Sequence, residues 1–212
     1  MVVREAQKQV TREAILSAAA EEFALHGYRG TTFSSIAERM GRPKSALGYH
    51  QFRSKLDIAS SVVSEQGMRW KALLDQALAR PLGVATYFCT LLSAAEDARA
   101  NPLAAASVRL LLESRTLPEL VLPPLGFSWR GFGRDQIEAS IANGELPHEL
   151  DAGATTAQLL NGAFGVFEAE NRQLQDADTS AAIIALWTVM LTGLGAADVP
   201  AIMRDVRAFG FA

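Results

Sequence analysis

Glycine and threonine residues divide the N-terminal region into short helical stretches, and this spacing constrains the fold more than any other feature of the chain. After Thr11, a residue suited to cap a helix, apolar residues recur at every fourth position until Gly27. The recurring residues are Ile15, Ala19 and Phe23. The pattern predicts a first helix over residues 11–26.

A second and a third short helix are predicted immediately afterwards. Thr32 is another cap candidate, and Gly41 ends the apolar face that follows it. Pro43 suits the first turn of the third helix. The residues expected to point inward are Phe33, Ile36, Ala37 and Met40, followed by Ala46 and Leu47. Two short helices joined by a glycine-centred turn predict a helix-turn-helix motif.

The rest of the chain has the spacing of helices and no alternating pattern of strands. A long helix is predicted after Ser54 and ends at Pro81. Further helices are predicted over residues 82–97, 102–116, 124–143, 152–172 and 180–195, with a terminal piece from Val199. We therefore predict an all-α fold.

Positive charge is concentrated near the N-terminus. The 212 residues carry a net charge of −3, which divides into +4 through Lys55 and −7 over the remainder. A basic head on an acidic body is typical of a polyanion-binding module joined to a second domain. A solvated surface that is basic by chance is the alternative. We place the helix-turn-helix domain at residues 1–55 and a second helical domain at residues 56–212.

Other classes of protein have little support in the sequence. The single cysteine, Cys89, excludes an internal disulfide framework. No apolar run approaches the ~20 residues of a membrane helix, and the start MVVREAQKQV lacks the apolar stretch of a secretory signal. We expect a cytoplasmic protein. The histidines are scattered and no metal-binding or phosphate-cradling pattern occurs, so we predict no enzyme, cofactor or metal.

The helix-turn-helix motif gives the basic residues a function. In such a motif the second helix enters the major groove by its N-terminal end, and phosphate contacts lie at its flanks. The early positions, expected to read bases, are Arg42, Lys44 and Ser45. The flanking positions, expected to contact the DNA backbone, are Thr32, Tyr49, His50, Arg53 and Lys55. The predicted partner is double-stranded DNA.

The run TFSSIAERMGRPKSALGYHQFRSK resembles the DNA-binding domain of TetR-type transcriptional regulators. The residues that match the pattern of that family are Thr32, Ile36, Ala37, Gly41, Tyr49, Phe52 and Lys55. Gly41 and Tyr49 stand one residue farther apart than in the pattern, which predicts an insertion in the turn or the recognition helix. The resemblance implies that residues 56–212 form a ligand-binding and dimerisation domain.

The segment PPLGFSWRGFGRDQIEASIANGELP resembles part of the γ-butyrolactone autoregulator receptors that control antibiotic production. In those receptors a tryptophan at the position of Trp129 contacts the ligand; an ordinary core position is the alternative. Further expected contacts are the aromatic residues Phe132 and Phe164 and the polar residues Tyr87, Arg109 and Gln136. The polar groups would donate to a lactone carbonyl or a carboxylate, and a surface ion pair is the alternative for Arg109.

Two late helices are predicted to form a homodimer. The resemblance implies a four-helix bundle across a two-fold axis, which presents two recognition helices about 34 Å apart to a near-palindromic operator. The residues expected in this interface are Ala157, Ala163, Ile183, Trp187, Met190 and Leu191. An intramolecular core is the alternative for any one of them.

The predicted function is that of a transcriptional repressor released from its operator by a small signalling molecule. A γ-butyrolactone, butenolide or furan that controls secondary metabolism is the expected effector. A TetR-type sensor of a drug or another metabolite is the first alternative, since it would use the same architecture. A helical enzyme or a protein adaptor is the alternative of a different class.

Overall fold

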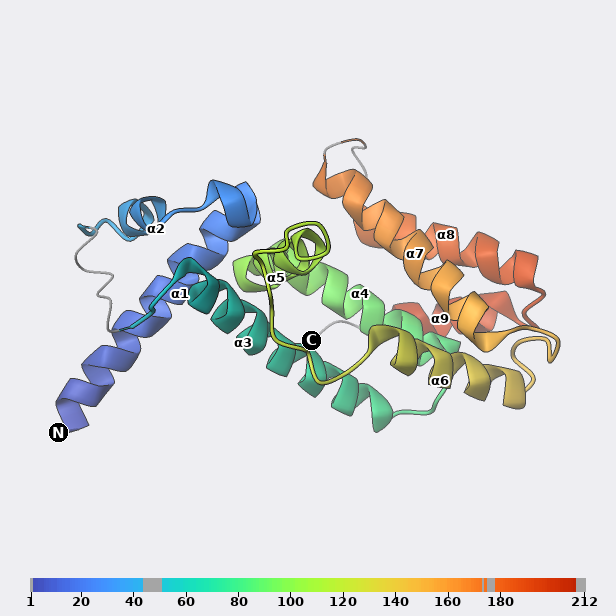
Figure 1. Ribbon diagram of the computed structural model, residues 1–212. Coiled ribbons are helices and arrows are strands. Elements are labelled where there is room, and N and C mark those ends of the chain that lie inside the picture. The colour runs from blue at the N-terminus through green and yellow to red at the C-terminus, as the bar shows by residue number, and fades with distance from the viewer. Residues whose placement is uncertain (1, 44–50, 173, 175–177, 209–212) are drawn as a thin grey trace. The chain divides into compact units, whose positions relative to one another are not determined.

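The computed structural model describes residues 2–43, 51–172, 174 and 178–208, and within them all regular structure is helical (Figure 1). This confirms the predicted all-α class. The helices are α1 (Val2–Gly30), α2 (Phe33–Arg39), α3 (Lys55–Leu78), α4 (Val84–Ala100), α5 (Pro102–Glu113), α6 (Trp129–Ala142), α7 (Ala152–Asn171), α8 (Thr179–Leu194) and α9 (Val199–Ala208). The predicted third short helix falls mainly on residues 44–50, outside the described residues.

The chain packs as two compact units. The first combines Met1–Trp70 with Asp97–Gly126, and the second combines Lys71–Glu96 with Phe127–Ala212. Helices α3 and α4 each continue from one unit into the other. The domain boundary predicted after residue 55 divides the chain by function and stays a prediction. It does not coincide with the boundaries of the two packing units.

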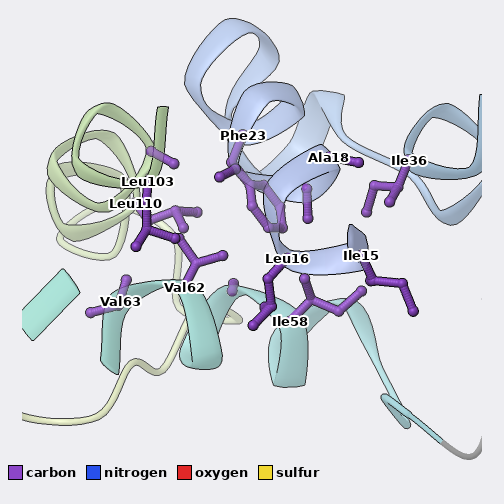
Figure 2. Close-up of a cluster of buried hydrophobic side chains, with 14 of the residues drawn as sticks. Ile15, Leu16, Ala18, Phe23, Ile36, Ile58, Val62, Val63, Leu103 and Leu110 are labelled. Atoms are coloured by element: carbon purple, nitrogen blue, oxygen red, sulfur yellow. The ribbon is translucent and has the colours of Figure 1, made fainter. Parts of the chain in front are cut away.

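Helices α1, α2, α3 and α5 share the hydrophobic core of the first unit (Figure 2). Phe23 of α1, Ile36 of α2 and Ile58 of α3 are completely shielded from solvent. Full burial of such a side chain stabilises a fold by about 1.5–3 kcal/mol. Leu110 of α5 is buried in the same cluster, so the helix-turn-helix region packs against a segment far along the chain.

Helix α1 is longer than the sequence predicted. It begins at Val2, and the hydroxyl of Thr11 donates a hydrogen bond of 2.9 Å to the carbonyl of Gln7. Threonine can occupy a helix interior when its hydroxyl bonds back to the preceding turn, so Thr11 is not the cap that we predicted. Gly27 interrupts the helix as expected, with φ of 69° and ψ of −177°, and one further turn follows.

The boundaries of α2 agree with the sequence. Thr32 is its N-cap: the Thr32 hydroxyl accepts from the amide of Ser35, and the Ser35 hydroxyl accepts from the amide of Thr32. This reciprocal pair satisfies two amides at the start of the helix. Gly41 follows the helix with φ of 63°, a conformation that glycine adopts without strain.

The second unit has a core of its own, formed by α4, α6, α7, α8 and α9. Phe88 of α4 and Trp187 of α8 stack at its centre, with ring centroids 3.8 Å apart and planes inclined by 7°. The indole of Trp187 donates to the carbonyl of Leu159 in α7 at 3.3 Å. The stacked pair therefore joins three helices.

Helix α6 caps the start of α4. The side-chain carbonyl of Gln136 accepts from the amide of Gly83 at 3.0 Å, and the hydroxyl of Ser140 accepts from the amide of Val84 at 2.7 Å. These bonds satisfy amides that have no partner within α4 itself. The sequence placed the start of α6 at residue 124, but Ser128 caps it and the helix begins at Trp129.

No helix within the described residues is long and apolar enough to cross a membrane.

Candidate functional site

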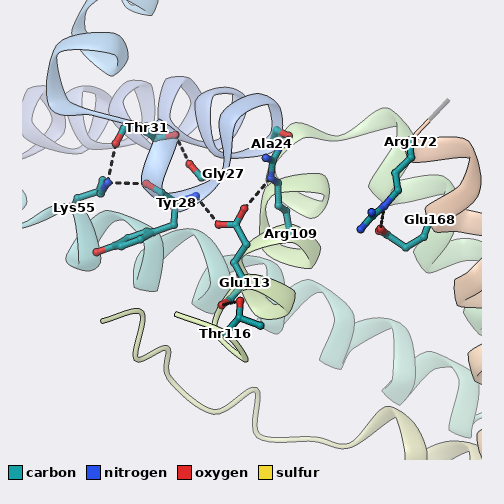
Figure 3. A network of polar contacts seen from close by, with 10 residues as sticks. All are labelled: Ala24, Gly27, Tyr28, Thr31, Lys55, Arg109, Glu113, Thr116, Glu168 and Arg172. Carbon is teal, nitrogen blue, oxygen red and sulfur yellow. Dashed lines mark hydrogen bonds and ion pairs between the residues drawn. The ribbon is translucent and has the colours of Figure 1, made fainter. Parts of the chain in front are cut away.

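Lys55 stabilises the turn between α1 and α2 (Figure 3). Its ammonium group donates to the carbonyls of Tyr28 and Thr31, at 2.6 and 2.8 Å, and lies 4.4 Å from the centre of the Tyr28 ring. Burial lowers the pKa of Lys55, against the opposing charges of Glu119 and Glu113. The phosphate contact that we predicted for Lys55 stays a prediction, for an ammonium group that already donates to two main-chain carbonyls.

Glu113 anchors the same turn from the end of α5 (Figure 3). Its carboxylate accepts the amide of Tyr28 at 2.6 Å and pairs with Arg109 at 3.1 Å. Arg109 in turn donates to the carbonyl of Ala24 at 2.9 Å. Glu113 was not among the predicted site residues, since no local pattern connects two positions that are 85 residues apart.

Arg39 links α2 to α1 through two ion pairs. Its guanidinium donates to the carboxylates of Glu22 at 2.6 Å and of Glu21 at 2.8 Å. Glu22 is 4% exposed. Burial raises its pKa, but hydrogen bonds from Arg39 and Ser35 together with the charges of Arg39 and His26 outweigh burial and leave the pKa below the ordinary value of 4.5.

The other predicted DNA contacts fall into three groups in the structure. Arg42 and Arg53 are exposed on either side of residues 44–50. Lys44, Ser45, Tyr49 and His50 lie outside the described residues. Thr32 is exposed, and its hydroxyl accepts the hydrogen bond from the amide of Ser35 that caps α2. The contacts proposed for Arg42, Arg53 and Thr32 therefore stay predictions on accessible residues.

Three of the predicted ligand contacts meet in the second unit. The rings of Tyr87 in α4 and Phe132 in α6 lie edge to face at 6.3 Å. Gly133 leaves no room for a side chain beside Tyr87, since an added Cβ would lie 2.7 Å from the Tyr87 ring. Gln136 follows Gly133 by one helical turn and is fully buried. These three side chains define a candidate site in the core of the second unit, with two polar groups among apolar neighbours.

Both polar groups present an atom without a partner. Among the described residues, neither the hydroxyl of Tyr87 nor the side-chain NH₂ of Gln136 forms a hydrogen bond, and both atoms are buried. The bond from Gly83 to the carbonyl oxygen of Gln136 fixes which end of the amide is free. Burial raises the pKa of Tyr87 far above its ordinary value, so both groups are donors at neutral pH.

The other predicted ligand contacts are placed differently. Trp129 is partly buried at the start of α6, where its ring lies 5.4 Å from Phe127, edge to face. Phe164 is 37% exposed on α7, which places its ring outside the core that holds Tyr87. Arg109 belongs to the first unit, where Glu113 and the carbonyl of Ala24 engage it. The ligand contacts predicted for Phe164 and Arg109 stay predictions, for a partly exposed residue and for a residue that is ion-paired within the first unit.

The predicted dimer contacts stay predictions, and most of these residues lie in the core of the single chain. Ala163, Ile183, Trp187 and Leu191 are buried in the core of their own chain, because they face the helices α4 and α7 or α8 of the same unit. Met190 is partly buried, and its sulfur lies against Gly162; Ala157 is also partly buried. The exposed apolar side chains on these two helices include Phe164 and Val189, the latter 70% exposed.

No group of three or more histidine, cysteine or acidic side chains suited to a metal ion occurs among the residues that the structure describes.

The all-helical fold, the capped helix α2 and the exposed Arg42 that follows it agree with the first half of a helix-turn-helix motif of DNA-binding proteins. Residues 15–62 match the profile of the bacterial regulatory proteins of the tetR family. The chain belongs to the TetR family of transcriptional regulators. Members of this family are DNA-binding regulators rather than enzymes.

The chain is similar to several characterised proteins. The HTH-type transcriptional regulator LmrA of Bacillus subtilis is 44% identical over 55 residues, which span 26% of this chain and 29% of that protein. A structure described as the molecular basis for control of antibiotic production by a bacterial hormone is 30% identical, with 87% of this chain and 95% of that chain covered and a TM-score of 0.65. The crystal structure of a γ-butyrolactone receptor (ArpA-like protein) is 21% identical, covers 95% of each chain with a TM-score of 0.73, and shares the fold.

Proposed function

We propose that this regulator is a cytoplasmic repressor that a small signalling molecule of the γ-butyrolactone, butenolide or furan type releases from its operator, and that it controls secondary metabolism. The observation that carries the proposal is the pair of buried donors, the Tyr87 hydroxyl and the Gln136 NH₂, in the core of the second unit. The named functions of two similar structures, hormone control of antibiotic production and γ-butyrolactone reception, support it.

A ligand that carries oxygen acceptors complements this site. A buried polar atom without a partner costs about 1–3 kcal/mol, so a bound acceptor recovers that energy. A lactone carbonyl or a furan carboxylate supplies one or two such acceptors. The neighbouring ring of Phe132 and the partly buried Trp129 suit the alkyl part of the ligand. An apolar drug without acceptors leaves both donors unsatisfied.

The proposed mechanism is a linkage between two binding events. The free dimer binds its operator, and the effector binds better to the conformation in which the two DNA-binding regions no longer match the operator. Effector and DNA then weaken each other's binding by the same factor. Helices α3 and α4 are continuous between the two units and are the elements through which we expect the signal to pass.

Fluorescence anisotropy on the DNA upstream of the gene tests the proposal. The purified protein is titrated at fixed salt, first alone and then with butyrolactones, butenolides, furan carboxylates and unrelated apolar drugs. We expect tight, sequence-selective binding that one of the first three classes abolishes. Release by an apolar drug alone would favour the drug-sensor alternative, and the absence of selective binding would contradict the repressor.

A further inference from the structure

The N-terminal part of α1 extends well beyond the hydrophobic core. None of residues 6–14 is buried, and Ile15 is buried directly after them. At 1.5 Å per residue, the stretch from Val2 to Ala14 is about 20 Å long. Burial of apolar surface does not account for this extension, because the side chains of residues 6–14 stay in contact with solvent.

Polar contacts hold the extension against the residues that follow the predicted recognition helix. The side-chain NH₂ of Gln51 donates to the carbonyl of Lys8 at 3.1 Å. Arg12 donates to the hydroxyl of Ser61 at 3.0 Å and to the carbonyl of Gln51 at 3.5 Å, and its guanidinium lies 4.4 Å from the centre of the Phe52 ring. The start of α1 is thereby fixed beside residues 51–53.

A hollow of about 640 Å³ lies between these elements and is rich in positive charge. Its lining residues are Lys8, Arg12, Gln51, Phe52, Arg53, Asp57 and Ser61. The one carboxylate of this lining, Asp57, accepts the amide of Arg53 at 3.0 Å. Three cationic side chains therefore face one carboxylate that already has a hydrogen bond.

Two of the three cations are available to an anion. Arg12 is engaged by Ser61 and Gln51, whereas Lys8 and Arg53 are exposed. Among the described residues the side chains of Lys8 and Arg53 form no ion pair. A phosphate group fits such a pair, because lysine and arginine both donate to its oxygens and arginine can do so in a bidentate manner.

We propose that this hollow binds a backbone phosphate of the operator, with Lys8 on α1 as a DNA contact outside the helix-turn-helix motif. The inference rests on the proposed DNA-binding function. The occupant is a phosphodiester of the same duplex that the predicted recognition helix would enter, because three residues of the lining, Gln51, Phe52 and Arg53, follow that helix directly in the sequence. A lysine contact of this kind adds affinity without reading sequence.

The salt dependence of operator binding tests this contact. The dissociation constant of full-length Lys8→Ala and of the wild type is measured by anisotropy between about 50 and 200 mM KCl, on an operator obtained by in vitro selection and on unrelated DNA. Loss of one phosphate contact in each protomer reduces the slope of log K against log salt by about 1.8 for the dimer, so the wild type should lose about 12-fold more affinity than the variant over this range. Lys8→Arg should restore the wild-type slope.

Lys71→Ala is the matched control, since it removes the same charge from a lysine that pairs with Asp75 outside the first unit. Its slope should equal that of the wild type. An unchanged slope for Lys8→Ala overturns the inference but leaves the repressor function standing if the wild type binds selectively. A change in the ratio of operator to unrelated DNA would show base contact instead of phosphate contact. Without selective binding by the wild type, both the function and the inference fail.

Discussion

At the scale of single residues, the hydroxyl of Tyr87 should contribute to ligand binding and not to the stability of the ligand-free protein. It is buried and has no hydrogen-bond partner among the described residues. Tyr87→Phe keeps the ring against Phe132 and removes only this atom. We expect the free energy of unfolding of the ligand-free protein to stay the same or to rise by up to about 1 kcal/mol, and effector affinity to fall about 3- to 10-fold.

Urea unfolding and calorimetric titration of the effector measure the two quantities. Operator affinity without effector serves as the control and should not change. A Tyr87→Phe protein that unfolds much more easily would assign the hydroxyl to the fold rather than to the ligand.

The lowered pKa of Glu22 predicts that the first unit loses stability at low pH. Its pKa in the folded protein lies below the ordinary value of 4.5, so the unfolded chain takes up a proton first as the pH falls. The stabilisation from Glu22 is therefore complete above about pH 4.5 and is lost as the pH falls through the lowered pKa. In Glu22→Gln the free energy of unfolding should be lower at about pH 7 and should depend less on pH below about 4.5.

Urea unfolding between about pH 7 and pH 3 provides this comparison. Glu21→Gln is the matched control, because Glu21 pairs with the same Arg39 but is more exposed. The side chain of Glu21 is 40% exposed, against 6% for the side chain of Glu22. A smaller loss of stability is expected for it, since exposed ion pairs contribute little. Identical pH profiles for Glu22→Gln and the wild type would exclude this assignment.

At the scale of helices, the close contact between α1 and α5 depends on Gly27. Its φ of 69° is costly for other residues, and an added Cβ would collide with the Glu113 carboxylate and lie 2.9 Å from Nε of Arg109. Gly41→Ala isolates the backbone cost, because Gly41 has φ of 63° and an added Cβ would meet nothing within 4 Å. We expect Gly41→Ala to lose about 1 kcal/mol and Gly27→Ala at least about 2 kcal/mol.

Thermal and urea unfolding of the two variants decide this prediction. Equal losses would mean that Glu113 and Arg109 move aside without cost and that the contact between α1 and α5 is loose.

The sequence predicted helices and their ends where the signal was local. Gly27, Thr32 and Gly41 interrupt or cap helices through their own backbone and side-chain chemistry, which needs no knowledge of the rest of the fold. The predicted start of α1 was wrong because the sequence does not distinguish a threonine that caps a helix from one whose hydroxyl bonds back to the preceding turn.

The candidate sites were harder to predict, because they depend on contacts between distant residues. No spacing in the sequence pairs Glu113 with Tyr28 or the carbonyls of the α1–α2 turn with Lys55. Helix α8 is apolar on all sides, so periodicity could not show that Trp187 points into its own core while Val189 points to solvent. The structure brings Tyr87, Phe132 and Gln136 into one core, and their contact with a ligand stays a prediction.

At the scale of the whole molecule, the exposed apolar face of α7 and α8 predicts the position of the dimer contact. TetR-family regulators act as dimers, and Val189 is 70% exposed on a helix that is rich in apolar residues. Val189→Arg places charge on this face in both copies. We expect its dimer dissociation constant to rise about 10-fold or more while the monomer stays folded.

Sedimentation at several protein concentrations measures the dimer, and circular dichroism checks the fold. Val121→Arg is the control, because Val121 is 72% exposed in the first unit. An unchanged dimer in Val189→Arg would move the interface to another surface of the chain.

Reciprocity between effector and operator is the final prediction, and it concerns the complete dimer. If the effector weakens operator binding by a certain factor, the operator must weaken effector binding by the same factor, which for such couplings is about 5- to 150-fold. Calorimetry with the free and the operator-bound dimer gives the effector affinities, and anisotropy gives the operator affinities with and without effector. Tyr87→Phe should lower both effector affinities and leave the operator affinity of the ligand-free dimer unchanged. Equal effector affinity for free and DNA-bound dimer would disprove release by linkage, because a ligand with no preference between two states cannot shift their populations.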